Sequence, residues 1–168
     1  MKFASHLAVV LIFVSAAAHA DSVSDCNDGS NPARQISGCT QVIAQTMLDE
    51  TLSVAYMNRG IAYAEQNKPA KALADFSSSI GANKANGVAY YNRGNVHFDL
   101  RKLRHAEADY SKAIELEPDM APAFLNRALV NERLGAREAS ISDYRAALAL
   151  DPMLSLASAG LKRLGSSL

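Results

Sequence analysis

The sequence has only two cysteines, no excess of charge of either sign and no apolar run long enough to cross a membrane. Its 168 residues include 17 lysines and arginines and 17 aspartates and glutamates. A nucleic-acid-binding domain normally carries a basic patch, so this balance argues against a nucleic-acid partner. The apolar run from Leu7 to Val14 has eight residues, whereas a membrane-spanning helix needs about 20. We therefore expect no membrane span.

A repeat of 34 residues dominates the rest of the sequence. The pattern YMNRG at Tyr56 returns as YYNRG at Tyr90 and as FLNRA at Phe124. A second pattern, an aspartate followed by an aromatic residue, keeps the same spacing at Asp75, Asp109 and Asp143. A fixed period of this length is typical of stacked helical hairpins, each of which cannot bury its apolar face alone. The repeat therefore predicts an all-α solenoid and favours binding over catalysis.

Small residues and prolines stand where such hairpins need them. Gly60, Gly94 and Ala128 allow two helix backbones to approach closely. Pro118 and Pro152 end helices, because proline disfavours a helical residue before it. We expect helices near residues 53–66, 70–81, 87–100, 104–117, 121–134 and 137–150.

With these features the chain resembles the tetratricopeptide repeat (TPR) family, in which aromatic residues, glycine, alanine and proline recur at fixed positions. The best match is residues 87–120, with Tyr90, Gly94, Ala106, Tyr110, Ala113 and Pro118. The tryptophan usual in the family is absent, and tyrosine or phenylalanine takes its place. The resemblance implies a right-handed TPR solenoid of about three helical hairpins, with a degenerate N-terminal half-repeat and a C-terminal capping helix.

The N-terminus has the pattern of a secretory signal peptide. Lys2 supplies the positive end, Leu7 to Val14 the apolar core, and Ala18-His19-Ala20 a cleavage site of small residues. We expect cleavage after Ala20 and a periplasmic or secreted protein. The predicted division is a signal peptide (1–20), a disulfide-linked segment with a degenerate half-repeat (21–52), three TPRs (53–86, 87–120 and 121–154) and a capping helix (155–168).

The two cysteines of an exported chain predict one disulfide, between Cys26 and Cys39. With an offset of 37 residues, Cys39 aligns with Phe76 and Cys26 with Tyr63, both at positions that face the inside of a hairpin. Residues 33–46 then correspond to the second helix of a degenerate hairpin with a truncated first helix. A metal site is the competing interpretation, but His97 and His105 form no ligand spacing with the cysteines.

An arginine and an aspartate recur in phase in every repeat. Pairing within one hairpin gives every arginine a partner, whereas pairing between successive hairpins gives only two pairs. The first arrangement is favoured, and in either case we expect structural ion pairs rather than a catalytic unit. The residues are Arg59, Arg93 and Arg127, with Asp75, Asp109 and Asp143.

The resemblance implies that the first helix of each hairpin lines a concave groove. An asparagine recurs there, and its amide can bond both backbone groups of an extended peptide. Apolar and aromatic residues share the face, as binding surfaces often do. The expected groove residues are Met57, Asn58, Ile61, Tyr91, Asn92, Asn95, Phe98, Leu125, Asn126 and Leu129. The alternative is that the asparagines only solvate or cap neighbouring helices and that the apolar residues contact the adjacent repeat.

One activity of the family is not supported by the groove residues. Some TPR domains hold the C-terminal carboxylate of chaperones with lysine or arginine at three groove positions. These positions carry no cation here: they are Val54, Met57, Asn58, Val88, Tyr91, Asn92, Pro122, Leu125 and Asn126. Only Arg133 offers positive charge on this face.

The sequence lacks a glycine-rich phosphate loop, a nucleophile elbow and a pair of metal-binding motifs. We therefore expect no enzyme, cofactor or metal. His97 is expected at a packed position and His105 at an exposed helix start. The predicted function is an exported interaction module, an adaptor or scaffold that binds a protein or peptide in its groove. The alternative is a structural protein that self-associates, such as a homodimer whose groove is filled by its own copy.

Overall fold

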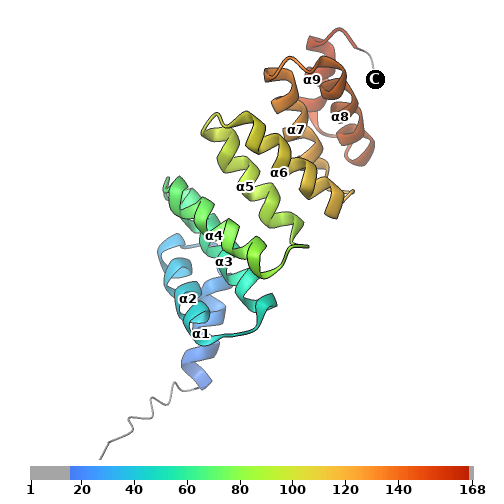
Figure 1. Cartoon of the computed structure of the whole chain (residues 1–168). Helices are drawn as coiled ribbons and strands as arrows, with labels where there is room; N and C mark the ends of the chain where they lie inside the picture. Colours follow the sequence, from blue (N-terminus) through green and yellow to red (C-terminus); the bar gives the residue numbers. More distant parts are fainter. Residues whose placement is uncertain (1–15, 167–168) are drawn as a thin grey trace, which may run out of the picture.

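The computed structural model describes residues 16–166, which form helices joined by short turns (Figure 1). Most of the predicted signal peptide, residues 1–15, lies outside this range. The predicted helices are present, although α3 begins at Asp49 rather than near residue 53. The helices are α1 (Ala16–Asn27), α2 (Pro32–Gln45), α3 (Asp49–Glu65), α4 (Pro69–Ala82), α5 (Gly87–Asp99), α6 (Leu103–Leu116), α7 (Ala121–Arg133), α8 (Arg137–Leu150) and α9 (Ser155–Arg163).

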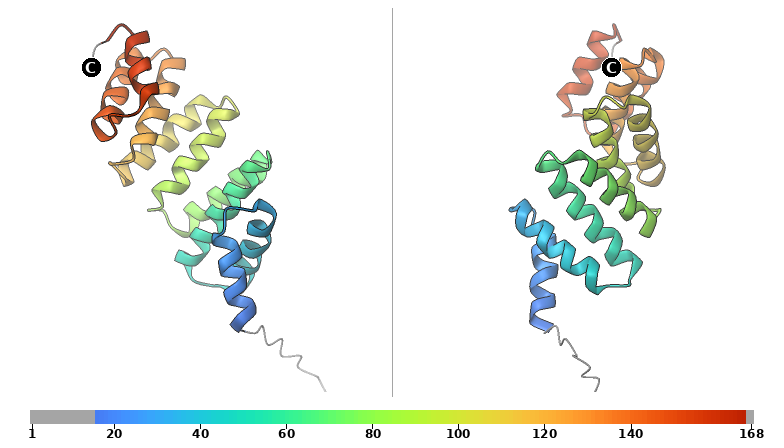
Figure 2. Two further views of the ribbon diagram at one scale, coloured as in Figure 1. Left: turned by 180° about the vertical axis from the view of Figure 1, so that it is seen from behind. Right: turned by 60° about the vertical axis from the view of Figure 1, so that its left-hand side comes forward.

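Consecutive helices pack in pairs, α1 with α2, α3 with α4, α5 with α6 and α7 with α8, and α9 packs on α8. The pairs stack into the elongated solenoid seen in Figures 1 and 2, as the repeat predicts. The first helices of successive pairs touch each other, whereas among the described residues the second helices, such as α4 and α6, do not. The stack therefore curves, with the first helices on its inner side.

A left-handed backbone residue separates the two helices in three of the pairs. Asn67 has φ 54°, Arg101 59° and Gly135 77°, and each lies 34 residues from the next. Only glycine adopts this conformation without steric cost. Pro69 follows as the first residue of α4, where its missing N–H leaves no helical hydrogen bond unmade. The chain thus reverses in each of these repeats through a turn of the same conformation, although the residue at the left-handed position differs.

The small residues predicted at the helix crossings are required there. A Cβ atom on Gly60 would lie 2.8 Å from the ring of Phe76, and one on Gly94 would lie 2.8 Å from the ring of Tyr110. Ala128 is fully buried at the equivalent position of the third pair. The large buried ring of each second helix therefore fits against the small residue of its own first helix.

Each arginine of the repeat pairs within its own hairpin, so the favoured arrangement is confirmed. Arg93 donates from Nε to Asp109 Oδ2 at 2.9 Å and from Nη2 to Asp109 Oδ1 at 2.7 Å. The same two-fold contact joins Arg59 to Asp75 and Arg127 to Asp143. The aspartates are buried, and planar two-point contacts of this kind fix orientation as well as charge.

The third guanidinium nitrogen of each arginine reaches the preceding hairpin. Arg93 Nη1 donates to Ser77 Oγ on α4 at 3.2 Å, and its guanidinium lies 5.5 Å from the centre of the Tyr90 ring. Equivalent contacts join Arg59 to Thr40 and Arg127 to Ser111. We call this set of contacts, an arginine with its aspartate and hydroxyl partners, the arginine node. Each node ties three helices together.

In the described residues, the arginine node is absent at both ends of the stack. At each end two of the residues that would form it are replaced by others. At the N-terminal end the equivalents of Arg59 and Asp75 are Ser22 and Gly38, by the offset of 37. A Cβ atom on Gly38 would lie 2.7 Å from the backbone nitrogen of Cys26, so α1 and α2 are in backbone contact. At the C-terminal end the buried Leu161 stands where the next arginine would be. Arg145 stands at the position that Ser77 and Ser111 occupy as hydroxyl partners in the earlier hairpins.

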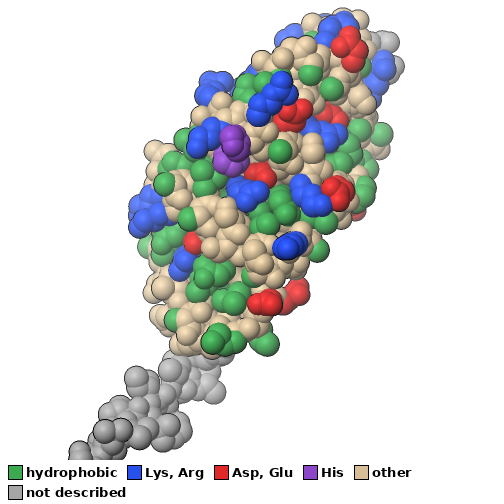
Figure 3. Space-filling model, in the orientation of Figure 1, with side chains coloured by type: hydrophobic (Ala, Val, Ile, Leu, Met, Phe, Trp, Pro, Cys, Tyr) green, Lys and Arg blue, Asp and Glu red, His purple; other side chains and the backbone are tan. Residues whose placement is uncertain are grey.

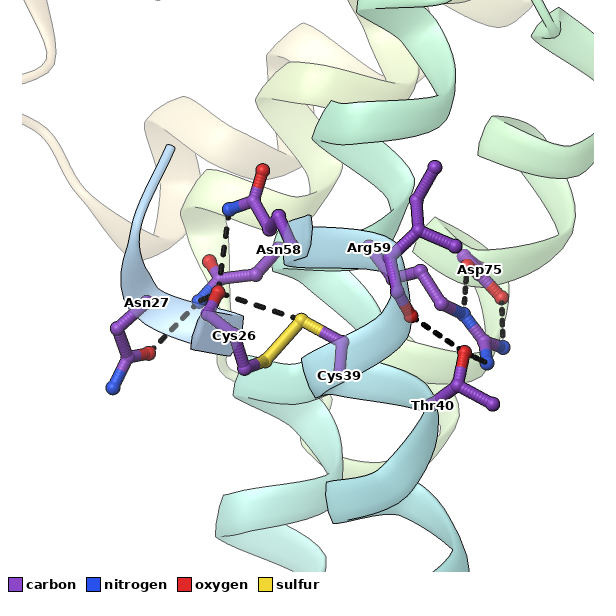
Figure 4. The surroundings of a disulfide bond; sticks show 9 residues. Cys26, Asn27, Cys39, Thr40, Asn58, Arg59 and Asp75 are labelled. Atoms are coloured by element: carbon purple, nitrogen blue, oxygen red, sulfur yellow. Dashed lines mark hydrogen bonds and ion pairs between the residues drawn. A yellow bond between two sulfur atoms is a disulfide. The ribbon is translucent and has the colours of Figure 1, made fainter. Parts of the chain in front are cut away.

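The predicted disulfide joins α1 to α2, with Cys26 and Cys39 bonded through their sulfur atoms (Figure 4). Both cysteines are buried, and they pack with Val42 and Ala55. The N-terminal segment contains two helices, of which α1 is the shorter, and Gly38 permits their close approach. Because α1 starts at Ala16, the predicted cleavage site lies within this helix.

The C-terminal helix α9 covers the apolar end of the third hairpin, as expected of a capping helix. Leu161 is buried, and Lys162 and Arg163 are exposed. Hydrophobicity alone would predict that Leu156 is buried in this helix, but its side chain is 62 % exposed. Ala157 is buried instead, since it continues the register of the inward-facing Ala55, Ala89 and Ala123 at intervals of 34 residues.

The arginine node leads to a prediction about stability. Arg93→Ala leaves the buried carboxylate of Asp109 without its charged partner, so the free energy of unfolding should fall by about 2–4 kcal/mol. The double variant Arg93→Met with Asp109→Leu removes both charges and should recover most of the loss. Urea unfolding followed by circular dichroism measures both. Equal stability of wild type and Arg93→Ala would contradict the assigned role.

Candidate functional site

The inner face of the stack carries the residues predicted to line the groove. They lie on α3, α5 and α7, the first helices that touch one another along the stack. We call the surface formed by Met57, Asn58, Ile61, Tyr91, Asn92, Asn95, Phe98, Asn126 and Leu129 the groove face. All nine are partly buried. The tenth predicted residue, Leu125, is only 8 % exposed, because it packs under α9 with Tyr144 and Leu161.

The three equivalent asparagines have different surroundings. Asn58 Nδ2 donates to Cys26 O at 3.2 Å and to Asn27 Oδ1 at 3.1 Å, both on α1 (Figure 4). Asn126 Nδ2 donates to Asn95 Oδ1 at 2.9 Å and to the Tyr91 hydroxyl at 3.3 Å. The side chain of Asn92 makes no hydrogen bond to any residue in the range 16–166. Two asparagines thus connect adjacent repeats, and the central one keeps both its donor and its acceptor.

The residues at the equivalent positions of the preceding repeat explain why the three asparagines differ. Asn126 bonds to Asn95 and Tyr91 of α5. The equivalent neighbours of Asn92 on α3 are Ile61 and Met57, which offer no oxygen to accept a hydrogen bond. The amide of Asn92 is therefore left for a ligand or for solvent.

Aromatic residues lie on the same helix as Asn92 and on its neighbours. The Tyr91 ring lies 5.9 Å from the ring of Tyr110, whose hydroxyl donates to Asn95 Oδ1 at 2.8 Å. Burial raises the pKa of Tyr110, so its hydroxyl stays protonated and acts as a donor. Further along the face, the guanidinium of Arg133 lies 4.1 Å from the centre of the Phe98 ring. The middle of the groove face thus combines aromatic surface, one amide and one cation.

An ion pair with α9 limits the groove face at its C-terminal end. Arg163 donates to both carboxylate oxygens of Glu132, at 2.5 and 2.7 Å, and the Tyr144 hydroxyl donates to Glu132 at 2.8 Å. The arginine lowers the pKa of Glu132, and burial raises the pKa of Tyr144 to about 12. Since Arg163 is already paired, Arg133 is the cation that remains available nearby.

A cavity that the sequence did not indicate lies at the N-terminal end. Its volume is about 200 Å³, and α1, α2 and α3 form its walls. Val54 lies one helical turn before Asn58 on the same side of α3, so the cavity adjoins the groove face. The lining residues are Val23, Cys26, Asn27, Val42, Glu50, Thr51, Val54 and Ala55. We call it the N-terminal cavity.

Two further cavities lie beside the arginine nodes and are lined by equivalent residues one repeat apart. The first, of about 360 Å³, includes Ser77, Arg93, His97, His105 and Asp109. The second, of about 290 Å³, has Ser111, Arg127, Asn131, Ala139 and Asp143 in their places. The arginines and aspartates are already paired, so these cavities follow from the repeat and show no distinct chemistry.

His97 occupies the packed position expected of it, with its side chain 14 % exposed. Its Nε2 lies 3.8 Å from Asp109 Oδ2, its Nδ1 has no partner among the described residues, and its ring is 5.1 Å from that of His105. Burial lowers the pKa of His97; Asp109 opposes this, and His105, Arg93 and Lys102 add to it. His97 is therefore held neutral.

Between residues 16 and 166, no helix is long and apolar enough to cross a membrane. The same residues contain no group of three or more His, Cys, Asp or Glu side chains placed to hold a metal ion.

Models of the tetratricopeptide repeat match residues 87–120 and 121–152. Residues 87–152 are tetratricopeptide repeats. The α3–α4 hairpin has the same node, turn and core positions, but its predicted boundaries of 53–86 stay a prediction. A comparison with curated proteins finds no significant match.

Solved TPR structures resemble most of the chain. The Arabidopsis OM64 TPR domain is 28 % identical, with 70 % of this chain and 97 % of that one covered and a TM-score of 0.67. The first TPR of Spaghetti (RPAP3), bound to the HSP90 peptide SRMEEVD, is 25 % identical, with 70 % and 94 % covered and a TM-score of 0.68. MamA is 19 % identical, with 92 % and 87 % covered and a TM-score of 0.68, and shows the fold alone.

The buried His97 leads to a prediction about pH. Because its pKa is lower in the folded protein than the ordinary value of 6.5, the unfolded chain takes up the proton first as the pH falls. The free energy of unfolding should therefore be unaffected above that value and should decrease below it. Urea unfolding at a series of pH values measures the decrease.

His97→Tyr provides the matched variant, since Tyr63 stands at the equivalent position one repeat earlier. It should lose this part of the pH dependence. His105→Gln should keep most of it, because burial of His97 is the largest cause of the lowered pKa. An unchanged profile in His97→Tyr would assign the dependence to other groups.

Proposed function

We propose that the protein binds an extended segment of another polypeptide along the groove face, as an adaptor or scaffold. The observation that carries the proposal is the unpaired side-chain amide of Asn92 on α5, the helix that also carries Tyr91 and Phe98 of the groove face. An amide with a free donor and a free acceptor matches the two polar groups of one peptide unit. Aromatic residues on the same helix supply apolar contact area, which often dominates binding energy.

The similar TPR structures support binding of a polypeptide in general. The Spaghetti TPR domain was solved with an HSP90 peptide, so a related stack of helices accepts an extended ligand. The ligand class does not carry over to this chain. The groove positions where a carboxylate-binding TPR would need cations hold valine, proline, methionine, tyrosine, leucine and asparagine, and Arg163 is paired with Glu132.

We further propose that the protein is exported and acts in an oxidising compartment, such as a bacterial periplasm. The predicted signal peptide and the Cys26–Cys39 disulfide support this location, because such bonds persist in oxidising surroundings. Cleavage after Ala20 would shorten α1 to residues 21–27, and the disulfide would then hold the remaining helix against α2.

Asn92→Ala tests the binding site. Loss of the amide leaves two backbone groups of the ligand unpaired, so affinity should fall by about 1–3 kcal/mol, mostly through faster dissociation. Folding stability should change little, because the amide is unpaired in the free protein. A peptide array probed with wild type identifies a ligand, and calorimetry then compares the variants.

Arg93→Ala is the control for this experiment, because it lies next to Asn92 but points into the arginine node. It should lower stability, while the folded protein binds the peptide normally. If Asn92→Ala lowers the melting temperature and leaves the affinity unchanged, the asparagines are structural and the groove face is not the binding site.

Export is tested separately by the N-terminus of the mature protein. Mass spectrometry of the periplasmic or secreted fraction should find a chain that begins at Asp21. Thiol labelling of this protein, unfolded without reductant, should modify neither Cys26 nor Cys39. A cytosolic protein that retains Met1 and has two reactive thiols would contradict the proposed location.

A further inference from the structure

We propose that the N-terminal cavity binds a single apolar side chain from a basic segment of the partner polypeptide. This inference rests on the proposed function, since it places one end of the bound segment, and it adds the chemistry that the partner must present. Three properties of the cavity support it: its apolar walls, its charged surroundings and the amides beside it.

The walls of the cavity are apolar and come from three helices. Val23 and Cys26 come from α1, Val42 from α2, and Val54 and Ala55 from α3. A volume of about 200 Å³ is below the range of about 300–1,000 Å³ that is usual for small-molecule sites, and it suits one aliphatic side chain. Val54 is 40 % exposed, so the opening is accessible from the inner side of the stack.

The surroundings of the cavity carry a local excess of negative charge in an otherwise balanced protein. Residues 21–52 contain five carboxylates and one arginine, a net charge of −4, whereas residues 53–168 contain 15 cations and 12 carboxylates, a net charge of +3. Glu50 lines the cavity, and neither it nor its neighbour Asp49 forms an ion pair within the described range. The acidic residues of the segment are Asp21, Asp25, Asp28, Asp49 and Glu50.

Figure 3 shows this arrangement from one side. Acidic side chains lie beside hydrophobic ones near the N-terminal end of the stack, and further along it lysines and arginines lie among other acidic side chains. Carboxylates in the first turn of α3 also interact favourably with the helix N-terminus. That local effect concerns only Asp49 and Glu50, and it does not account for the excess of negative charge over residues 21–52. An acidic surface of this kind attracts a basic ligand, because the charges are complementary.

Two amides next to the cavity can bind the backbone of the same segment. Asn58 Nδ2 is used by Cys26 O and Asn27 Oδ1, but within residues 16–166 Asn58 Oδ1 and Asn27 Nδ2 have no partner. Asn27 lines the cavity, and Figure 4 shows Asn58 and Asn27 close to the disulfide, so these two groups offer one acceptor and one donor. A bound segment can therefore place its side chain between the valines while its backbone continues toward Asn92.

Short dye-labelled peptides provide the probe, and Val54→Asp provides the test. The first peptide has a central leucine flanked by lysines, the second has alanine for leucine, and the third has glutamate for the lysines. Fluorescence anisotropy measures each affinity. The leucine–lysine peptide should bind wild type more tightly than either other peptide, by about tenfold or more.

Val88→Asp is the matched control. Val88 is equivalent to Val54 one repeat later, and the two are exposed to nearly the same extent, 37 % and 40 %, but Val88 does not line the cavity. Val54→Asp should weaken binding by about tenfold or more, and Val88→Asp should have a smaller effect. In methyl NMR spectra the peptide should shift the signals of Val23, Val42 and Val54.

Three results would overturn the inference. These are equal effects of Val54→Asp and Val88→Asp, equal affinity for the leucine and alanine peptides, and methyl shifts confined to Ile61 and Leu129 of the groove face. The last would leave the proposed binding along the groove face intact, whereas failure of Asn92→Ala to alter any peptide affinity would contradict that proposal separately. Reduction of the disulfide should release α1 and reproduce the effect of Val54→Asp.

Discussion

The arginine node is the interaction on which the rest of the structure depends. A helical hairpin buries its own crossing with small residues and one large ring, but nothing in that contact sets how one hairpin sits on the next. The guanidinium supplies this second contact, because two nitrogens hold the aspartate of its own hairpin and the third reaches a hydroxyl of the preceding hairpin. A side chain with a rigid planar set of donors suits this task better than a flexible lysine.

The regular stacking has a direct effect on the groove face. Since the nodes keep successive first helices in contact, equivalent residues form rows along the inner side of the stack. The hydrogen bonding of each asparagine in this row then depends on the preceding repeat. Asn126 bonds to Asn95 of that repeat, whereas the equivalent residue for Asn92 is Ile61. One substitution in a neighbouring helix thus decides whether an amide joins two repeats or faces outward.

The sequence predicted those features that depend on the repeat itself. The helices, the arginine–aspartate pairs and the disulfide could be placed because each residue has a counterpart at a fixed offset. Hydrophobicity alone would bury Leu156, whereas the repeat register assigns the inward position to Ala157. Leu125 was misplaced because the position of α9 over it is a tertiary contact. The N-terminal cavity could not be predicted, since Val23, Val42 and Val54 come together only when α1 has docked.

The replaced residues at the two ends also bear on how such a chain can change its length. Duplication of an internal unit, such as residues 87–120, would supply each new arginine with its aspartate and with a serine on the helix before it. A unit appended after residue 154 would instead place its arginine opposite Arg145, and the two positive charges would repel each other. Lengthening by tandem duplication is therefore compatible with the middle of the chain, and growth at the C-terminal end would require replacement of Arg145 as well.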